Sequence, residues 1–260
     1  MFNRLKSILI SLYIWGFLFI TILPLFLIYL MVWLLVLSFD SRKSIPHDYT
    51  VFWARLYLWI NPWWSLDMDG MEKIDRSKPV ILVSNHQSVM DIAMLLQLGI
   101  QFRWVCKIEL VRIPVVGWVI RMNRHILVRR GNKLSVLHMA DACKNSLANG
   151  IPVCFFPEGT RTEHGDLGLF KDGAFILARE TGHEIVPVIL DGPLEALPKR
   201  GWLFKGKQHF MIRVLNRISE GVIRELNLDQ LVAYTRNIMA DCLKQLHHEN
   251  QLKGHGKNSW

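Results

Sequence analysis

The stretch VILVSNHQSVMDIAMLLQL, residues 80–98, predicts a β-strand over residues 80–84, a polar turn, and a helix over residues 90–98. Its strand is an unbroken apolar run, which is typical of a sheet covered on both faces. Outward from it, short β-branched runs and helical segments alternate along the chain. Further strands are predicted at residues 102–106, 125–128, 151–156, 184–190 and 209–215, and further helices at residues 133–148, 171–181 and 229–247. This alternation predicts an α/β domain over residues 78–247, with a mostly covered sheet and flanking helices.

An N-terminal run without charged side chains, residues 8–39, precedes this domain. It is longer than the roughly 20 residues of one membrane span and longer than the apolar part of a signal peptide. Residues 1–43 are therefore predicted to be a membrane-embedded helical segment. Pro24 lies near the middle, where it disfavours a straight helix, and basic pairs at both ends favour two cytoplasmic ends: Arg4 with Lys6, and Arg42 with Lys43. We expect a shallow, kinked helical hairpin, with one long tilted span as the alternative.

The next segment, residues 44–77, has few charges and contains Trp53, Trp59, Trp63 and Trp64. Tryptophan favours the interface between lipid headgroups and acyl chains, so we expect an aromatic interfacial helix followed by a linker. A buried core helix with aromatic packing is the alternative. At the other end of the chain, residues 248–260 are polar and are expected to form a loose C-terminal tail.

The 260-residue chain carries a net charge of +9, which suits a polyanionic partner. The sequence shows neither the arginine-rich helices nor the stacking-aromatic motifs of nucleic-acid binding. Because hydrophobic residues make up 51% of the chain, an anionic lipid bilayer is the better partner. The four cysteines are widely spaced and the histidines show no HExxH pattern, so we expect no metal site and no bound cofactor.

The polar turn contains His86 and, five positions later, Asp91. In one continuous helix the two side chains would be about 140° apart around the axis and could not meet. If His86 lies in the turn and the helix begins near Ser88, the chain folds back and the carboxylate reaches the imidazole. A carboxylate on one ring nitrogen leaves the other free to accept a proton, which describes a general base at the ligand-binding end of a strand. The alternative is a turn in which Ser88 caps the helix.

A second polar turn lies in FFPEGTRT, residues 155–162, after another predicted strand. Gly159 allows the backbone to approach a ligand, and the Arg161 guanidinium can bind a phosphate through two hydrogen bonds. Glu158 can orient Arg161 or accept from a substrate hydroxyl. The alternative is a surface turn that holds an arginine–glutamate pair. Two cations near other predicted strand ends, Lys107 and Arg130, are solvated charges unless their surroundings assign them a role.

Four stretches resemble, in order and spacing, the motifs of the 1-acylglycerol-3-phosphate acyltransferase family, whose members share NHxxxxD and FPEGTR. They are NHQSVMD at residues 85–91, KIELVRIPVVG at residues 107–117, FPEGTR at residues 156–161 and VPV at residues 186–188. The resemblance covers residues 79–190. One departure is RHILVRR at residues 124–130, where Arg124 and Arg129 stand in place of the family's glycine and aspartate. A Ser-His-Asp hydrolase is disfavoured, because Ser88 lies outside any G-x-S-x-G motif.

The resemblance implies roles for individual residues. His86 would deprotonate the acceptor hydroxyl, Asp91 would hold the imidazole, and the hydroxyl oxygen would attack an acyl thioester directly. The substrate-binding residues would be Glu158, Gly159, Thr160 and Arg161, assisted by Arg130 and Lys107, with motif support from Asn85, Pro157 and Pro187.

The expected enzyme is a membrane-bound O-acyltransferase of phospholipid synthesis. It would move a fatty acyl group from acyl-CoA or acyl carrier protein to the sn-2 hydroxyl of 1-acyl-glycerol-3-phosphate, giving phosphatidic acid. Its catalytic domain would face the cytoplasm, at the inner or cytoplasmic membrane if the source is a bacterium. The alternatives are another lysophospholipid or a lyso-ornithine lipid as the acceptor, and a non-catalytic protein that binds anionic lipid. The acyl-chain length, the donor carrier and the oligomeric state stay open.

Overall fold

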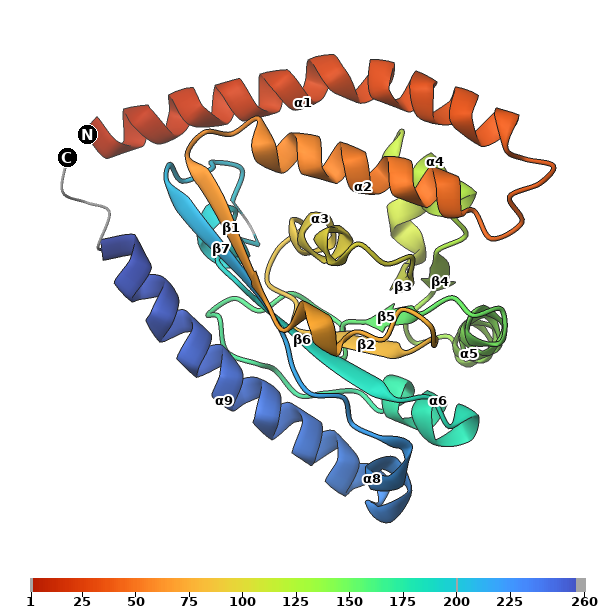
Figure 1. Cartoon of the computed structure of the whole chain (residues 1–260). Helices are drawn as coiled ribbons and strands as arrows, with labels where there is room; N and C mark the ends of the chain where they lie inside the picture. The colour runs from red at the N-terminus through yellow and green to blue at the C-terminus, as the bar shows by residue number, and fades with distance from the viewer. Residues whose placement is uncertain (1, 200, 256–260) are drawn as a thin grey trace.

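A computed structural model describes residues 2–199 and 201–255 of the chain. In this part of the chain, seven strands form one sheet in the order β1-β7-β6-β2-β5-β3-β4 (Figure 1). Neighbouring strands are parallel except for β6 and β7, which are antiparallel. The strands are β1 (Trp64–Asp69), β2 (Ile81–Ser84), β3 (Arg103–Lys107), β4 (Ile126–Val128), β5 (Val153–Phe155), β6 (Ile185–Asp191) and β7 (Gln208–Val214).

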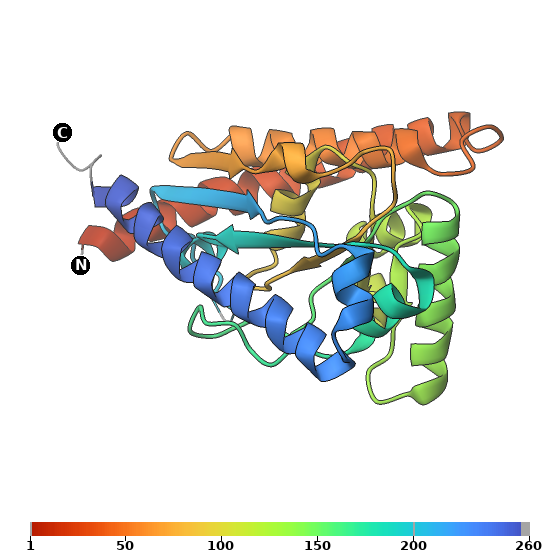
Figure 2. The same ribbon diagram turned by 60° about the horizontal axis from the view of Figure 1, so that its bottom comes forward.

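Helices cover both faces of this sheet (Figures 1 and 2). Successive strand residues point to opposite faces, so Leu82 and Val83 of β2 enter different hydrophobic cores. Leu82 packs in the core shared with α2 (Ser44–Trp59) and α3 (Asp91–Leu95), whereas Val83 packs in the core shared with α5 (Lys133–Ala148), α6 (Gly173–Thr181) and α9 (Leu228–His255). The other helices are α1 (Phe2–Leu35), α4 (Val116–Met122), α7 (Pro193–Ala196) and α8 (Glu220–Glu225), with short 3-10 turns at Met71–Lys73, Leu96–Leu98 and Ile108–Arg112.

The predicted α/β fold with a covered sheet is confirmed, and all six predicted strands are present within two residues of their expected ends. The helix predicted over residues 133–148 matches α5. The edge strand β1 was missed, because it lies inside the segment predicted to be a linker over residues 44–77. Its sequence alternates apolar and polar residues, but it contains no β-branched residue and two aspartates, which are depleted in strands, and four of its six residues are exposed.

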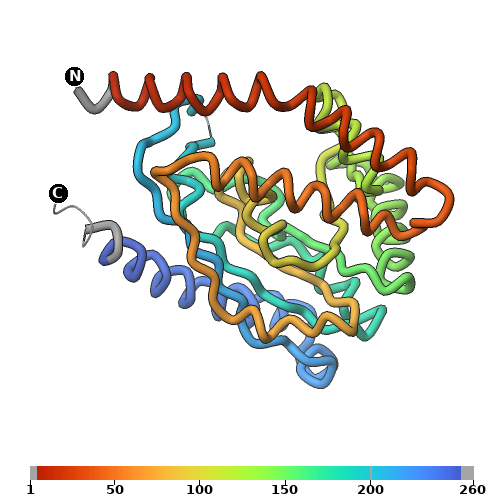
Figure 3. Tube along the Cα trace, turned by 45° about the horizontal axis from the view of Figure 1, so that its top comes forward, coloured from red at the N-terminus to blue at the C-terminus, as the bar shows by residue number. Residues whose placement is uncertain are grey.

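Residues 2–35 form one continuous helix, α1, with Pro24 inside it. The predicted hairpin is therefore wrong, and the single long helix that was our alternative is present. Proline removes only one backbone N–H from a helix, so the helix bends along its length and does not end (Figure 3). Within it, Leu5–Leu35 has a mean hydropathy of 2.6 and is long and apolar enough to cross a membrane.

Polar contacts connect both halves of α1 to the rest of the chain. The Trp15 indole donates to the Trp202 carbonyl (2.8 Å), and the Tyr29 hydroxyl donates to Asn123 Oδ1 (3.1 Å). The helix also lies beside α2 with the opposite chain direction (Figures 1 and 3). We conclude that α1 lies along the α/β domain as a part of the fold.

The tryptophans predicted to lie at a membrane interface divide between two environments. Trp53 of α2 is buried in a cluster with α1, as the core-helix alternative requires. Trp59, at the end of α2, is 79% exposed, and Trp63 is also exposed. Trp64 begins β1 and packs against the core. The core-helix alternative is thus met at Trp53, and contact of the exposed tryptophans with a membrane interface stays a prediction.

The final helix, α9, extends to His255, eight residues beyond its predicted end. The loose tail predicted over residues 248–260 is therefore wrong for residues 248–255, and residues 256–260 lie outside the described residues. Burial explains the extension, because the Asn250 amide donates to Asp191 Oδ2 (2.7 Å) and to the His209 carbonyl (3.0 Å). A polar sequence thus joins the folded domain through hydrogen bonds.

Candidate active site

The polar residues singled out by the sequence lie at the carboxyl edge of the sheet. His86 follows β2, Glu158 follows β5, Lys107 ends β3 and Arg130 follows β4. Because these four strands are parallel, their carboxyl ends point to the same edge. The fold thereby gathers residues that are up to 72 positions apart in the sequence, as the hydrogen bond between His86 and Glu158 shows.

His86 and Asp91 are in direct contact. His86 Nδ1 and Asp91 Oδ2 are 2.6 Å apart, and Asp91 is fully buried. The same oxygen accepts from the backbone amides of Gln87 (2.6 Å) and Ser88 (2.9 Å). The turn therefore folds back as expected, although the helix begins at Asp91 and not at Ser88.

These contacts fix the proton arrangement of the imidazole. Asp91 Oδ2 accepts two backbone N–H groups, so it also accepts from His86 and the Nδ1 atom carries the proton. Nε2 is then the ring atom that can accept a proton from a substrate. Burial raises the pKa of the Asp91 carboxyl, while the contacts with His86 and the two amides oppose this rise. The His86 side chain keeps 23% of its surface exposed, so a substrate can reach it.

Three groups hold the backbone and ring of His86. Glu158 accepts from the His86 amide through Oε1 (2.9 Å) and from the Gly168 amide through Oε2 (2.8 Å). The His86 carbonyl accepts from the Thr162 amide (2.8 Å). The imidazole stacks on Phe156, with ring centroids 4.2 Å apart. The segment after β5 therefore fixes the position of His86.

The contacts of Glu158 differ from the two that the sequence suggested, which were a contact with Arg161 and a hydrogen bond from a substrate hydroxyl. Both of its carboxylate oxygens accept backbone N–H groups, and the residue is only 8% exposed. Burial raises the pKa of Glu158, and the two backbone hydrogen bonds oppose that rise. Its observed contacts support the His86 turn and do not orient Arg161.

Asn85 anchors the start of the turn to strand β6. Its Nδ2 donates to the Leu190 carbonyl and its Oδ1 accepts from the Leu190 amide, both at 2.8 Å. Ser88 is buried, and its hydroxyl donates to the Leu197 carbonyl (2.9 Å), so it serves as a structural anchor and not as a nucleophile. Pro157 and Pro187 are buried beside these segments, Pro187 within β6.

The cations of the site form a group around Lys107, which we call the cation group: Lys107, Arg130, Arg161 and Lys199. Burial lowers the pKa of the Lys107 ammonium, and the charges of Arg130, Arg161 and Lys199 lower it further. Glu109 is the nearby carboxylate that opposes this effect. The structure therefore brings together the three cations that the sequence suggested and adds a fourth.

Lys199 was missed because it lies outside every motif, in the segment after α7. Its ammonium is 3.2 Å from Glu163 Oε1, which connects that segment to the turn that carries Arg161. Gly159 has a φ of +68°, a conformation that favours glycine, and Thr160 is exposed at the surface of the turn. An added Cβ at Gly159 would come within 3.0 Å of the Lys171 side chain. Glycine therefore fits both the backbone and the space of this turn.

Comparison with known proteins places the chain among acyltransferases. A family model described as Acyltransferase matches residues 65–191. A 1-acyl-sn-glycerol-3-phosphate acyltransferase of Chlamydomonas reinhardtii is 33% identical over 238 residues, which are 90% of this chain and 69% of that protein. The chloroplastic 1-acyl-sn-glycerol-3-phosphate acyltransferase LPAT1 of Arabidopsis thaliana is 37% identical over 165 residues, which are 63% of this chain and 46% of that protein. The chain thus spans about half the length of its plant relatives.

The fold is also that of a solved structure. The 1-acyl-sn-glycerophosphate acyltransferase of Thermotoga maritima superimposes with a TM-score of 0.76 over 94% of this chain and 97% of the other, at 23% identity. This likeness confirms the overall fold as a known one.

Proposed function

The chain belongs to the family of the 1-acyl-sn-glycerol-3-phosphate acyltransferases, and from this premise we propose that it makes phosphatidic acid by acylating the sn-2 hydroxyl of 1-acyl-glycerol-3-phosphate. The observation that carries the proposal is the contact between His86 and the buried Asp91, in a turn whose His86 carbonyl accepts from Thr162, the residue after Arg161 of the cation group. A base that faces an acceptor hydroxyl and cations that bind its phosphate are the two requirements of this reaction.

The proposed step transfers the acyl group directly. His86 Nε2 takes the proton of the acceptor hydroxyl while the hydroxyl oxygen attacks the thioester carbonyl carbon. The carbon–sulfur bond then breaks, and the leaving thiolate takes the proton back from the imidazolium. An activated thioester needs only a positioned base and an oriented hydroxyl, so no acyl-enzyme is required. The turn fixed by Asn85, Glu158 and Phe156 supplies that positioning.

The cation group is the proposed site of the acceptor phosphate. A phosphate monoester carries nearly two negative charges at neutral pH, which matches several convergent cations. Arg161 presents a planar guanidinium that can bind two phosphate oxygens, and Lys107, Arg130 and Lys199 add charge around it. Exposure of Lys107 and Arg130 leaves their charged ends accessible to a ligand.

We propose that the outer surface of α1 and the end of α2 contact the bilayer in which the acceptor and product reside. Large apolar side chains are exposed along α1, among them Leu9, Leu12, Phe19, Ile20, Leu23, Leu27 and Leu35. Because both halves of α1 are attached to the α/β domain, the whole domain would rest on the membrane with it. Arg42, exposed after α1, supports a cytoplasmic location for this side.

An acceptor panel tests the function. The full-length protein in detergent is given radiolabelled acyl-CoA or acyl carrier protein together with lysophosphatidic acid, lysophosphatidylcholine, lysophosphatidylethanolamine or a lyso-ornithine lipid. We expect transfer to lysophosphatidic acid, with phosphatidic acid as the product. Preferred transfer to another acceptor would contradict the headgroup assignment. If no lysolipid is acylated while anionic vesicles are bound, the protein is a non-catalytic lipid binder.

A further inference from the structure

A cavity of about 470 Å³ lies behind the His86 turn, on the side of the sheet covered by α9. It is enclosed by the segment at residues 164–167, the segment at residues 191–195 after β6, and α9. Figure 2 shows α9 extending along this side of the sheet. Its volume falls within the roughly 300–1,000 Å³ range of small-molecule sites. The cation group does not line this cavity, so it is a separate space.

Gln87 connects this cavity to the catalytic turn. The residue is 2% exposed, and its side chain lines the cavity. Its Oε1 atom is buried and has no hydrogen-bond partner among the described residues. Its backbone, by contrast, is fixed, because the Gln87 amide donates to Asp91. A buried carboxamide without a partner is costly, so the geometry suits a ligand that donates a hydrogen bond at this position.

The chemistry of the acyl donor supplies such a group. Both coenzyme A and acyl carrier protein carry the acyl chain on a pantetheine arm, which contains two amides. The amide nearer the sulfur is separated from it by two methylene groups. His86 and Gln87 are adjacent, with Cα atoms about 3.8 Å apart. An arm whose inner amide pairs with Gln87 would have to extend its thioester past the turn to the neighbouring His86 side chain, which does not itself line the cavity.

Side chains of both signs line the cavity. The carboxylates are those of Asp166, Asp191 and Glu195, and the basic groups are those of His164, Arg236, Lys244 and His247. Asp191 accepts a hydrogen bond from Asn250 Nδ2 (2.7 Å) and its other oxygen lies 3.3 Å from His247 Nδ1, so both carboxylate oxygens have partners within the protein. Lys244 of α9 lines the cavity and is exposed. It is therefore available for the phosphate at the outer end of the arm.

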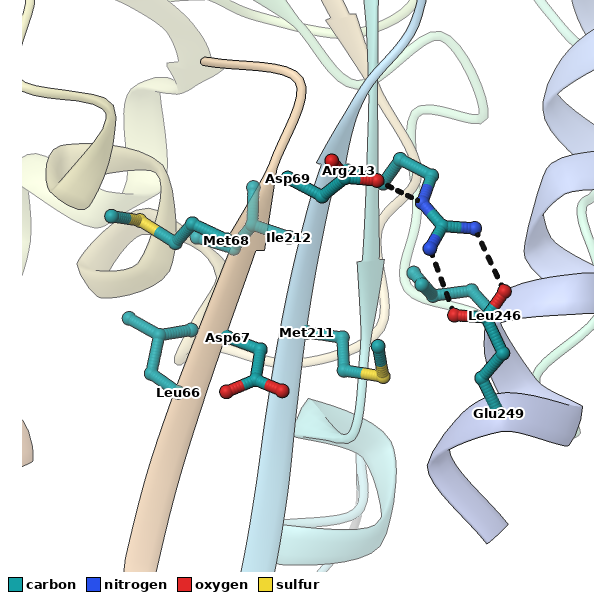
Figure 4. A pocket seen from close by; sticks show the side chains of 9 residues that line it. All are labelled: Leu66, Asp67, Met68, Asp69, Met211, Ile212, Arg213, Leu246 and Glu249. Atoms are coloured by element: carbon teal, nitrogen blue, oxygen red, sulfur yellow. Dashed lines mark hydrogen bonds and ion pairs between the residues drawn. The ribbon is translucent and has the colours of Figure 1, made fainter. Parts of the chain in front are cut away.

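A second cavity, of about 380 Å³ between β1, β7 and α9, provides the contrast (Figure 4). Its central group, Arg213, already pairs with Asp69 Oδ2 (2.9 Å) and with both oxygens of Glu249 (3.2 and 2.8 Å). These three side chains satisfy one another, so this cavity does not call for a ligand.

We propose that the cavity lined by Gln87 and Lys244 receives the pantetheine arm of the acyl donor. The inference rests on the proposed acyl transfer and adds the place where the donor binds. The acceptor phosphate would bind at the cation group and the donor arm would enter from the α9 side, so the two substrates would meet at His86 from different directions.

Narrowing the cavity is the first test. Ala240 of α9 lines it, whereas Ala233 of the same helix is exposed and does not. We expect Ala240→Phe to raise the KM for acyl-CoA about tenfold or more, because an added aromatic ring occupies space that the arm needs. The KM for lysophosphatidic acid should stay within twofold, and Ala233→Phe should change neither value. An unchanged donor KM in Ala240→Phe would overturn the proposal.

The polar contacts are tested with donors of different length. Gln87→Met keeps the length of the side chain without its amide and should raise the KM for acyl-CoA and acyl carrier protein alike, by about 3- to 10-fold. Lys244→Gln should weaken the binding of acyl-phosphopantetheine but not that of acyl-pantetheine, which lacks the phosphate. Lys133→Gln, at an exposed lysine of α5, is the matched control. If Gln87→Met raised the KM for acyl-CoA alone, Gln87 would recognise the nucleotide part of CoA, and the proposed contact with the pantetheine arm would be wrong.

Direct binding separates a failure of this site from a failure of the proposed function. Calorimetry with CoA and with 4′-phosphopantetheine is performed on the wild type, on His86→Ala and on Ala240→Phe. We expect His86→Ala to bind both probes without transferring acyl groups, and Ala240→Phe to bind both more weakly. If the wild type binds CoA in this cavity but acylates no lysolipid, the acceptor assignment fails and the donor site stands. If transfer occurs while Ala240→Phe binds both probes normally, the function stands and the donor site fails.

Discussion

Two of the histidine–aspartate pairs at this sheet lie in opposite surroundings. At the carboxyl edge, His86 Nδ1 and Asp91 Oδ2 are 2.6 Å apart, and the Asp91 side chain is fully buried. On the outer strands, His209 Nε2 and Asp67 Oδ2 are 3.2 Å apart, and the Asp67 side chain is 48% exposed. The second pair even includes a serine, since Ser65 Oγ is 2.7 Å from His209 Nδ1. Judged by residue type alone, the outer cluster of serine, histidine and aspartate resembles a catalytic triad more than the His86–Asp91 pair does.

The difference shows that orientation and burial, not residue identity, distinguish the two pairs. Ser65 and Asp67 are alternate residues of β1, and Ser65 lies opposite His209 in the parallel register, so strand pairing alone brings them together. Asp91, in contrast, receives two backbone amides in addition to the imidazole. Exposed ion pairs contribute only about 0–1 kcal/mol, whereas a buried carboxylate with several donors fixes a ring firmly. We therefore expect function at the first pair and not at the second.

The largest effect should come from removing the base. His86→Ala leaves the acceptor hydroxyl without a proton acceptor, so kcat should fall by about 10²- to 10⁴-fold while the protein remains folded. His138→Ala, at an exposed histidine of α5, is the matched control and should keep full activity. The measurement is the initial rate of acyl transfer, with circular dichroism to check the fold. Retention of more than a tenth of the activity in His86→Ala would contradict the assignment.

The next effect concerns the carboxylate that orients the base. Asp91→Asn keeps an oxygen for the Gln87 and Ser88 amides but removes the charge that stabilises a protonated imidazole. We expect kcat to fall by about 10²-fold, with the KM for lysophosphatidic acid changed less than threefold. Asp67→Asn is the corresponding change in the outer pair and should have no effect on kcat. Equal losses in the two variants would remove the distinction between the pairs.

The phosphate site should give a smaller effect, on binding. Arg161→Gln removes a guanidinium from the cation group, so the KM for lysophosphatidic acid should rise about 10-fold or more, and high salt should reduce the difference from the wild type. Arg121→Gln, at an exposed arginine of α4, should leave the KM unchanged. A loss confined to kcat would instead place Arg161 in the chemical step.

Sequence patterns predicted the central strands and the edge strand β4 but missed β1, the strand at the other edge. The strand at residues 81–84 is an unbroken buried run, so its hydrophobicity alone reveals it. β1 alternates serine and aspartate with apolar residues at an exposed edge, and only its pairing with β7 makes it a strand. In the N-terminal helix, by contrast, the sequence predicted a break that the structure does not contain. Pro24 predicts a break in an isolated helix, but packing against α2 and the domain keeps residues 2–35 helical.

The sequence likewise predicted some contacts of the candidate site and missed others. The spacing of His86 and Asp91, with helix geometry, was enough to require the turn that the structure contains. The partners of Glu158 could not be predicted from the sequence. Both are backbone N–H groups, which nearly every residue has, so no residue type marks them. Lys199 lies outside the motifs and joins the cation group only through the path of the chain after α7. Side-chain pairs within a motif are therefore predictable, whereas backbone partners and distant cations require the fold.

A further prediction concerns Glu158, whose effect should be on stability and its pH dependence. Glu158→Gln replaces one accepting oxygen with an NH2 group, so one backbone N–H loses its partner, at a cost of about 1–3 kcal/mol. Because burial raises the pKa of Glu158, the folded state binds this proton more tightly than the unfolded state does. The stability that this group contributes is thus fully present below its unfolded pKa and is lost as pH rises through its folded pKa. The glutamine side chain does not titrate, so the Glu158→Gln variant does not lose this stability as pH rises.

The difference in thermal stability between the wild type and Glu158→Gln should therefore shrink as pH rises above the ordinary glutamate range. Unfolding of both proteins in detergent, followed by circular dichroism across that range, measures it. A matched change at an exposed residue of the same charge, Glu225→Gln, should show no such trend. A difference that widens with pH would mean that the pKa of Glu158 is lowered in the folded protein.

The smallest effect should come from the outer pair itself. His209→Ala removes the contacts with Ser65 and Asp67 at the sheet surface, where solvent competes for each partner. The acyl-transfer rate should change less than twofold, and the free energy of unfolding should fall by no more than about 1 kcal/mol. The backbone contact between Asn250 and the His209 carbonyl remains in this variant, so α9 keeps its attachment. A strong loss of transfer in His209→Ala, with the fold intact, would mean that a pair assembled by strand register alone contributes to catalysis, and the contrast between the two pairs would no longer explain where the active site lies.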